Sequence, residues 1–266
     1  MNQAHHPLDR NPFDVIKWPG DAEVVLILDP CAIPDLGQKI FEWSRHVRGA
    51  DCLYVNTPWE PVQDVAPWAV WLSGPYDPVL QHFVQYGAVR EAGYVVMTSL
   101  PAPEFGHWLR QRIQIEPAPG TMELVRIGHP ALAAEIVGNH LIRTETGGAV
   151  TKMILPDRTR ASWIYQAPAN EVHADDSAGT ITLSHRLPEA FRQFNVRRAN
   201  LMIWDTLDDQ ARTELGGPEL PDAWPELCRL SEQAAAEGAT GIRSRMQYIS
   251  HWCSSTRSTK QYANCM

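Results

Sequence analysis

The sequence predicts an α/β protein of two lobes: an N-terminal lobe with a mixed, largely parallel sheet flanked by helices, and a mainly helical C-terminal lobe with a few short strands. In the first half of the chain, short runs rich in β-branched residues alternate with segments of helical periodicity, which is the pattern of β-α-β units. After residue 138 most apolar positions fall in longer helical segments. The 266 residues, 44 % of them hydrophobic, suffice for a sizeable core.

The first lobe is expected at residues 21–140, after an N-terminal tail of residues 1–20. It opens on EVVLIL at 23–28, a continuous apolar run typical of a strand covered on both faces. Asp35 then stands where it can cap a helix. Further strands are expected at 52–55, 68–72, 94–98 and 122–127, and helices at 35–45, 77–86, 103–113 and 130–137.

The second lobe is expected at residues 141–255, with its boundary within 139–150. The polar, small-residue composition of residues 256–266 predicts a flexible tail. Short strands are expected at 152–155, 162–165 and 180–183, and helices at 188–207, 222–236 and 242–251. The first of these helices has apolar positions that only partly follow a single stripe: Phe191, Phe194, Val196, Leu201 and Trp204.

The net charge, the apolar segments and the cysteines indicate which classes of partner and which cellular location to expect. The formal net charge of −8 disfavours nucleic acid, whose binding depends on neutralising phosphates, and suits protein partners with basic patches. No stretch approaches the roughly 20 apolar residues that span a bilayer, and the first residues are too polar for a signal peptide, so a cytoplasmic protein without membrane contact is expected. Five cysteines without a CxxC pair indicate neither a disulfide framework nor a zinc ribbon, and buried free thiols are expected.

No catalytic motif is complete. The turn after the first strand reads DPCAIPD rather than a glycine-rich phosphate loop, and neither GxSxG nor HExxH occurs, so no cofactor and no metal are expected. His5 and His6 are assigned to an unstructured tail. Asp175 and Asp176, beside His173, are assigned to a solvated turn, and Asp208–Asp209 to a polar helix surface or end.

Three side-chain types remain as functional candidates. Cys31 with a distant histidine is a conceivable nucleophile pair. Asp29 follows the first strand, where α/β folds often place a catalytic carboxylate, although a turn-forming Asp before Pro30 is the simpler interpretation. Among ten tryptophans, Trp59 and Trp224 lie beside prolines in connections and are the candidates for partner binding.

Several segments resemble the effector adaptor, or chaperone, domain of bacterial type VI secretion. The resemblance rests on the LD that ends the first strand, on APWAVWL, on FGHWLRQRIQI and on LVRIGHPALAAEIV, with weaker similarity in SWIY and in the closing helices up to about Trp252. The family positions that this chain matches, which we interpret as structural, are Asp29, Pro67, Leu109, Arg110, Arg126 and Pro130.

Three positions depart from the family pattern. Trp108 stands where the family often has His, His129 replaces an Asp, and Ala131 replaces an Arg. We expect His129 to substitute for the Asp as the acceptor at the start of the following helix.

The resemblance implies a non-catalytic protein that binds a specific toxic effector in the cytoplasm and helps to load it onto the spike protein of the secretion system. The helical lobe and the cleft between the lobes are the expected binding region. Two alternatives stay open: a hydrolase or transferase that uses Asp29, and a structural subunit of a larger complex.

Overall fold

The computed structural model describes residues 6–118, 120–139, 141–143, 149–168 and 182–263. The chain divides into two compact units, which are described separately. The first unit comprises residues 1–157 and 161–190, and the second comprises residues 158–160 and 191–266.

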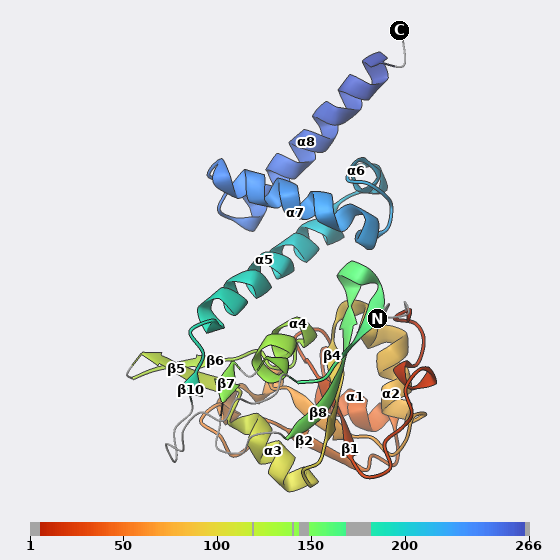
Figure 1. The fold of residues 1–266 in the computed structure, drawn as a ribbon, viewed down its shortest axis with the longest axis vertical. Coiled ribbons are helices and arrows are strands. Elements are labelled where there is room, and N and C mark those ends of the chain that lie inside the picture. Colours follow the sequence, from red (N-terminus) through yellow and green to blue (C-terminus); the bar gives the residue numbers. More distant parts are fainter. Residues whose placement is uncertain (1–5, 119, 140, 144–148, 169–181, 264–266) are drawn as a thin grey trace. The chain divides into compact units, whose positions relative to one another are not determined.

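A six-stranded sheet forms the centre of the first unit (Figure 1). Its strand order is β2-β3-β1-β4-β8-β9, and every neighbouring pair is antiparallel. The expectation of a largely parallel sheet is therefore wrong. The strands are β1 (Glu23–Leu28), β2 (Gly49–Cys52), β3 (Trp68–Trp71), β4 (Gly93–Thr98), β8 (Val150–Asp157) and β9 (Ser162–Gln166).

The error has a topological reason. Helix α1 (Leu36–Trp43) joins β1 to β2, and α2 (Pro78–His82) joins β3 to β4, as in β-α-β units. The strands joined in this way run in the same direction, but an antiparallel strand lies between them: β3 separates β1 from β2, and β1 separates β3 from β4. The alternation of strands and helices therefore predicts which strands a helix connects, but it does not predict which strands lie next to each other in the sheet.

The remaining elements of the first unit are short. Helix α2 continues as a π-helical turn at Phe83–Gly87, and α4 does so at Ala134–Gly138. Strand β5 was not predicted, and it pairs with β6. Strand β6 is shorter than the strand predicted at 122–127. These elements are α3 (Ala102–Arg110), α4 (Pro130–Ala133), the pairs β5 (Gln114–Ala118) with β6 (Thr121–Leu124) and β7 (Ile142–Arg143) with β10 (Thr182–Leu183), and 3-10 helices at Pro12–Asp14, Glu60–Val65 and Ala88–Arg90.

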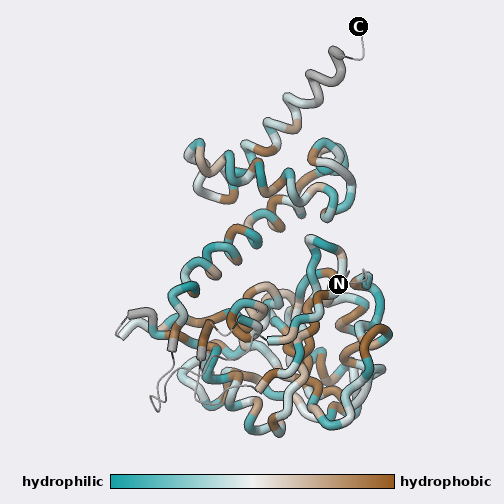
Figure 2. Tube along the Cα trace, viewed as in Figure 1, coloured by the Kyte–Doolittle hydropathy of each residue, from teal (hydrophilic) through white to brown (hydrophobic). Residues whose placement is uncertain are grey.

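Strand β1 is buried on both faces, as its sequence predicts. On one face its alternate residues Val24, Leu26 and Leu28 belong to a core cluster with side chains of α1 and of α2 with its π-helical turn, including Leu36, Ile40, Leu80 and Phe83. The intervening residues, Val25 and Ile27, point to the other face and are also fully buried. Figure 2 shows hydrophobic residues concentrated along these strands.

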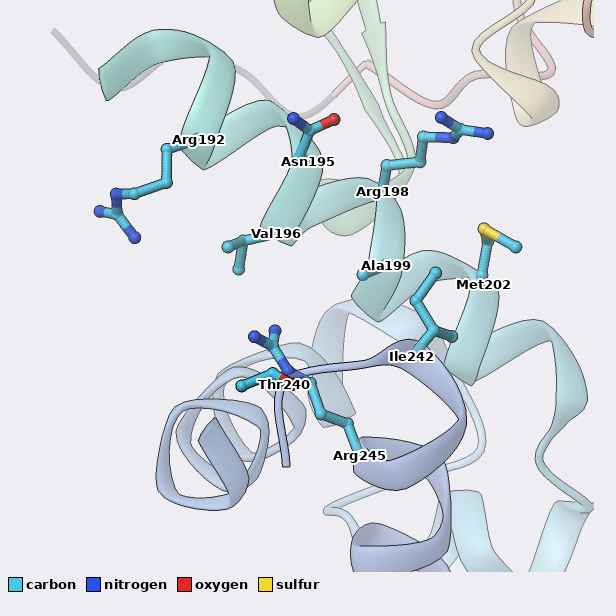
Figure 3. A pocket seen from close by; sticks show the side chains of 9 residues that line it. All are labelled: Arg192, Asn195, Val196, Arg198, Ala199, Met202, Thr240, Ile242 and Arg245. Atoms are coloured by element: carbon cyan, nitrogen blue, oxygen red, sulfur yellow. The ribbon is translucent and has the colours of Figure 1, made fainter. Parts of the chain in front are cut away.

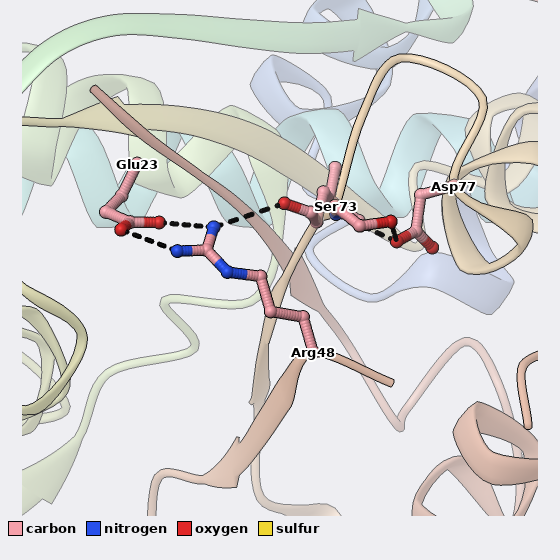
Figure 4. A network of polar contacts seen from close by, with 5 residues as sticks. Glu23, Arg48, Ser73 and Asp77 are labelled. Carbon is pink, nitrogen blue, oxygen red and sulfur yellow. Dashed lines mark hydrogen bonds and ion pairs between the residues drawn. The ribbon is translucent and has the colours of Figure 1, made fainter. Parts of the chain in front are cut away.

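Polar side chains fix the loops at one end of the sheet (Figure 4). Arg48 makes a two-pronged ion pair with Glu23, with N···O distances of 2.6 and 2.8 Å. Asp77 accepts from the Val79 backbone N–H at 2.9 Å and so caps α2. The cap predicted at the start of α1 is wrong, because Asp35 is in the left-handed region with φ of 57° and its side chain makes no capping hydrogen bond.

The N-terminal segment packs on the sheet from residue 6 onward, so the prediction of a free tail is wrong there. His6 is buried, and its Nε2 lies 2.9 Å from the Asn11 carbonyl oxygen. The Trp163 indole donates to the Arg10 carbonyl at 3.0 Å, and the Tyr165 hydroxyl donates to the Pro12 carbonyl. Burial of Tyr165, with a smaller effect of the Asp14 charge, raises its pKa to about 12. His5 lies outside the described residues.

The boundary between the units falls near residue 190 rather than within 139–150. The strands that the sequence assigns to the second lobe, β8 and β9, extend the central sheet by pairing with β4 and with each other. Their backbone hydrogen bonds place them in the first unit. The change of pattern after residue 138 marks the end of the alternating helices and not the end of the sheet.

The second unit is helical. Leu227, Leu230 and Ile249 are fully buried in its core, which Trp204 joins. It contains most of α5 (Leu187–Thr206), α6 (Asp209–Glu214), α7 (Leu220–Ala236), α8 (Ile242–Ala263) and the 3-10 turn Arg158–Arg160. Asp208 caps α6 through the Ala211 N–H, which confirms the predicted helix end. The last helix continues beyond the predicted end at His251 and includes most of the segment expected to be a flexible tail.

Among the described residues, no helix combines the length and the apolar character needed to cross a membrane.

Candidate functional site

Asp29 holds two parts of the first unit together. Its carboxylate is almost fully buried, and Oδ2 accepts from Arg126 Nε at 2.9 Å, with Arg126 Nη2 at 2.8 Å. Oδ1 accepts from the Cys31 N–H at 3.0 Å. The ion pair between this buried carboxylate and the partly exposed Arg126 therefore joins the end of β1 to the segment that leads into α4.

His129 extends this polar cluster. Its Nδ1 accepts from the Ala131 N–H at 3.2 Å, so it caps α4, and the prediction that it replaces the family's Asp as a helix-start acceptor is confirmed. Its Nε2 lies 3.7 Å from Oε2 of Glu91, whose carboxylate is buried. Pro130, the first residue of α4, is buried as well.

The other family positions form a second tie. Arg110 Nη2 donates to Asp51 Oδ1 at 2.6 Å and to the Cys52 carbonyl oxygen at 3.3 Å. These contacts join α3 to the edge strand β2. Leu109 is buried beside it, and the carbonyl of buried Pro67 accepts from the Leu53 N–H at 3.0 Å. The six motif residues thus belong to two structural ties and do not converge on one cavity.

A groove of about 420 Å³ lies in the second unit, between α5 and the start of α8 (Figure 3). Its apolar residues are half-buried Val196, buried Ala199, and Met202 and Ile242, which remain 45 % and 42 % exposed. The other lining residues are Arg192, Asn195, Arg198, Thr240 and Arg245.

The charge of the groove is opposite to that of the whole chain. Three of its nine lining residues are arginines, and among these described residues none is acidic, whereas the net charge of the protein is −8. Arg245 is held in place by donating to the Ala239 carbonyl at 3.1 Å and to Ser231 Oγ at 3.4 Å. Such a surface can bind a partner that presents carboxylates beside apolar side chains.

The sequence contains a signal for the α5 side of this groove. Val196 does not follow the stripe of Phe194, Leu201 and Trp204, which are buried. Together with Ala199 and Met202 it forms a second apolar row at three-residue spacing, on the α5 surface that lines the groove.

The match to a known family lies within the first unit. Residues 25–140 match the family described as a domain of unknown function, DUF4123. No curated protein and no solved structure matches the chain. The DUF4123 region contains all six motif residues, while every residue of the groove lies outside it.

The two tryptophan candidates lie in different units. Trp59 is inside the DUF4123 region, half-buried, and donates to Gln114 Oε1 at 2.7 Å. Trp224 packs against the core of the second unit. Neither lines the groove.

The cysteines and acidic residues considered from the sequence show no common site. Cys52 and Cys253 are buried free thiols, but Cys31 is exposed, contrary to expectation. Within the described part of the chain, no group of three or more His, Cys, Asp or Glu side chains could hold a metal ion. Cys265, His173 and Asp175–Asp176 lie outside the described residues.

His129 gives a stability prediction within the DUF4123 region. His129→Ala removes the α4 cap and is expected to lower the free energy of unfolding by about 1 kcal/mol. His129→Asn keeps a neutral acceptor at the start of α4, so its free energy of unfolding should fall less than that of His129→Ala. His129→Asp restores the family residue but adds a carboxylate near buried Glu91, so it should be less stable than His129→Asn. Urea denaturation of the three variants tests this order, and a fully stable His129→Asp would contradict it.

Proposed function

We propose that this protein is a non-catalytic adaptor that binds a toxic effector of a type VI secretion system in the cytoplasm and assists its loading onto the spike protein. The observation that carries the proposal is the DUF4123 match over residues 25–140, the region that also carries the adaptor-like motifs. The pairing of the buried Asp29 carboxylate with Arg126 supports it, because this carboxylate acts as a tie between segments.

The helical second unit is the proposed effector-binding part. It lies outside the matched region, which suits a role that must differ from one adaptor to the next. It also contains the groove, where apolar and cationic side chains are presented together. Specific recognition needs such a combination, since apolar contacts contribute affinity and charges select the partner.

Co-purification tests the proposal. The proposal predicts a toxin gene beside the gene of this protein. The full chain, tagged and co-expressed with that toxin, is expected to form a stable complex that survives size-exclusion chromatography. A toxin from an unrelated secretion cluster serves as the control and should not be retained. Deleting the gene should abolish secretion of the neighbouring toxin while secretion of the other toxin continues. Failure of the neighbouring toxin to bind would overturn the proposal.

A further inference from the structure

We propose that the groove between α5 and α8 binds an acidic amphipathic segment of the effector, with apolar side chains on the groove floor and Asp or Glu side chains against its arginines. This inference rests on the proposed function and specifies the partner chemistry of the second unit. Its observations are the lining of the groove, the exposure of its apolar residues and its charge.

The apolar part favours a peptide over a small polar ligand. Val196, Ala199 and Met202 follow one another along α5, and Ile242 lies close to Met202 at the start of α8 (Figure 3). Met202 and Ile242 are both nearly half exposed. A methionine side chain adapts to different apolar partners because it is unbranched and polarisable. A groove between two helices, with apolar residues spaced along one of them, suits an amphipathic helix.

The charged part selects an acidic segment. Arg192 and Arg198 extend from α5, while Arg245 extends from α8 toward the α5 surface that carries Val196 (Figure 3). The groove also lies at the start of α8, where the helix dipole adds positive potential. An arginine binds a carboxylate through two parallel hydrogen bonds, and the acidic remainder of this chain would repel the same segment elsewhere.

A pair of synthetic helical peptides tests the chemistry directly. Both are fluorescently labelled and have leucines on one face; the first has glutamates flanking that face, and the second has lysines in their place. The full-length protein is expected to bind the glutamate peptide at least about tenfold more tightly than the lysine peptide by fluorescence anisotropy. The difference should shrink as salt rises from about 0.05 to 0.5 M. Equal binding of the two peptides, or tighter binding of a labelled single-stranded DNA, would overturn the inference.

Substitutions locate the binding on the groove. Arg198→Glu and Met202→Glu change exposed positions of α5, so the fold should tolerate them, and each is expected to weaken binding of the glutamate peptide about tenfold. The first unit offers matched controls in Arg90→Glu and Val89→Glu, since Arg90 is exposed and Val89, like Met202, is 45 % exposed. Circular dichroism checks that all four variants are folded. Equal binding by groove and control variants would overturn the inference.

The same variants separate this inference from the proposed function. When the neighbouring toxin co-purifies with the wild type and the controls but is lost with Arg198→Glu and Met202→Glu, both stand. When all variants retain the toxin equally, the groove is not its binding site, but the adaptor function stands. When the wild type retains no toxin, the proposed function fails.

Discussion

Gly93→Ala is expected to be the most damaging small substitution in the first unit, lowering the free energy of unfolding by more than about 3 kcal/mol. Gly93 begins β4 with φ of 155°, directly opposite Leu28 of β1. A Cβ there would overlap the backbone oxygen of Ile27. Because that oxygen belongs to the central strand, the clash is relieved only by moving β1 and β4 apart.

Substitutions at two other glycines separate the steric clash at Gly93 from the effect of backbone strain. Gly120 has φ of 78°, but no described atom lies within 4 Å of the position that a Cβ would take, so Gly120→Ala reports only backbone strain, about 1 kcal/mol. Gly20 has open space and no positive φ, so Gly20→Ala should change the free energy of unfolding by less than about 0.5 kcal/mol. Urea denaturation followed by tryptophan fluorescence compares the three. Equal midpoints for Gly93→Ala and Gly120→Ala would show that β1 and β4 do not need this close approach.

The close approach at Gly93 also positions the cluster around Asp29. The Asp29 N–H donates to the Ala92 carbonyl at 2.8 Å, and Glu91, which lies 3.7 Å from His129, is the adjacent residue in the chain. The turn before β4 therefore contributes to the same cluster as the end of β1 and the start of α4. Three segments far apart in the sequence meet there, which places Asp29 near Arg126 and the start of α4.

Local features of the fold were predictable from the sequence, whereas long-range pairing was not. The apolar run of β1 showed a strand buried on both faces, and Asp77 with Pro78 marked the start of α2. Whether neighbouring strands are parallel or antiparallel depends on which strand lies between the two that a helix connects. No local sequence pattern contains that information. The position of β8 and β9 in the central sheet was missed for the same reason.

The candidate sites show the same division. The capping role of His129 was predictable because it depends on the next few residues. The burial of His6 was not, because its segment is held by hydrogen bonds to Trp163 and Tyr165, about 150 residues later in the chain. The groove combines α5 with the start of α8 and the turn before it, and the spacing of Val196, Ala199 and Met202 indicates only the α5 side.

Asp29→Asn is expected to lower the free energy of unfolding by about 2 kcal/mol. The variant keeps an acceptor for the Cys31 N–H but leaves the Arg126 guanidinium without its counter-charge. The Asp29 side chain is only 2 % exposed, while that of Arg126 is 28 % exposed, so water compensates part of the loss. The expected value therefore lies below that of a fully buried broken pair.

The double variant separates a structural role from a catalytic one. If the pair acts as a tie, Arg126→Gln in the Asp29→Asn background removes the uncompensated charge, and the double variant should be more stable than Asp29→Asn alone. The hydrolase or transferase alternative predicts instead that Asp29→Asn keeps its stability and loses a measurable activity. The activity of a catalytic carboxylate would not return when the neighbouring arginine is removed. A double variant that is more stable than Asp29→Asn and still binds the toxin would therefore favour the adaptor.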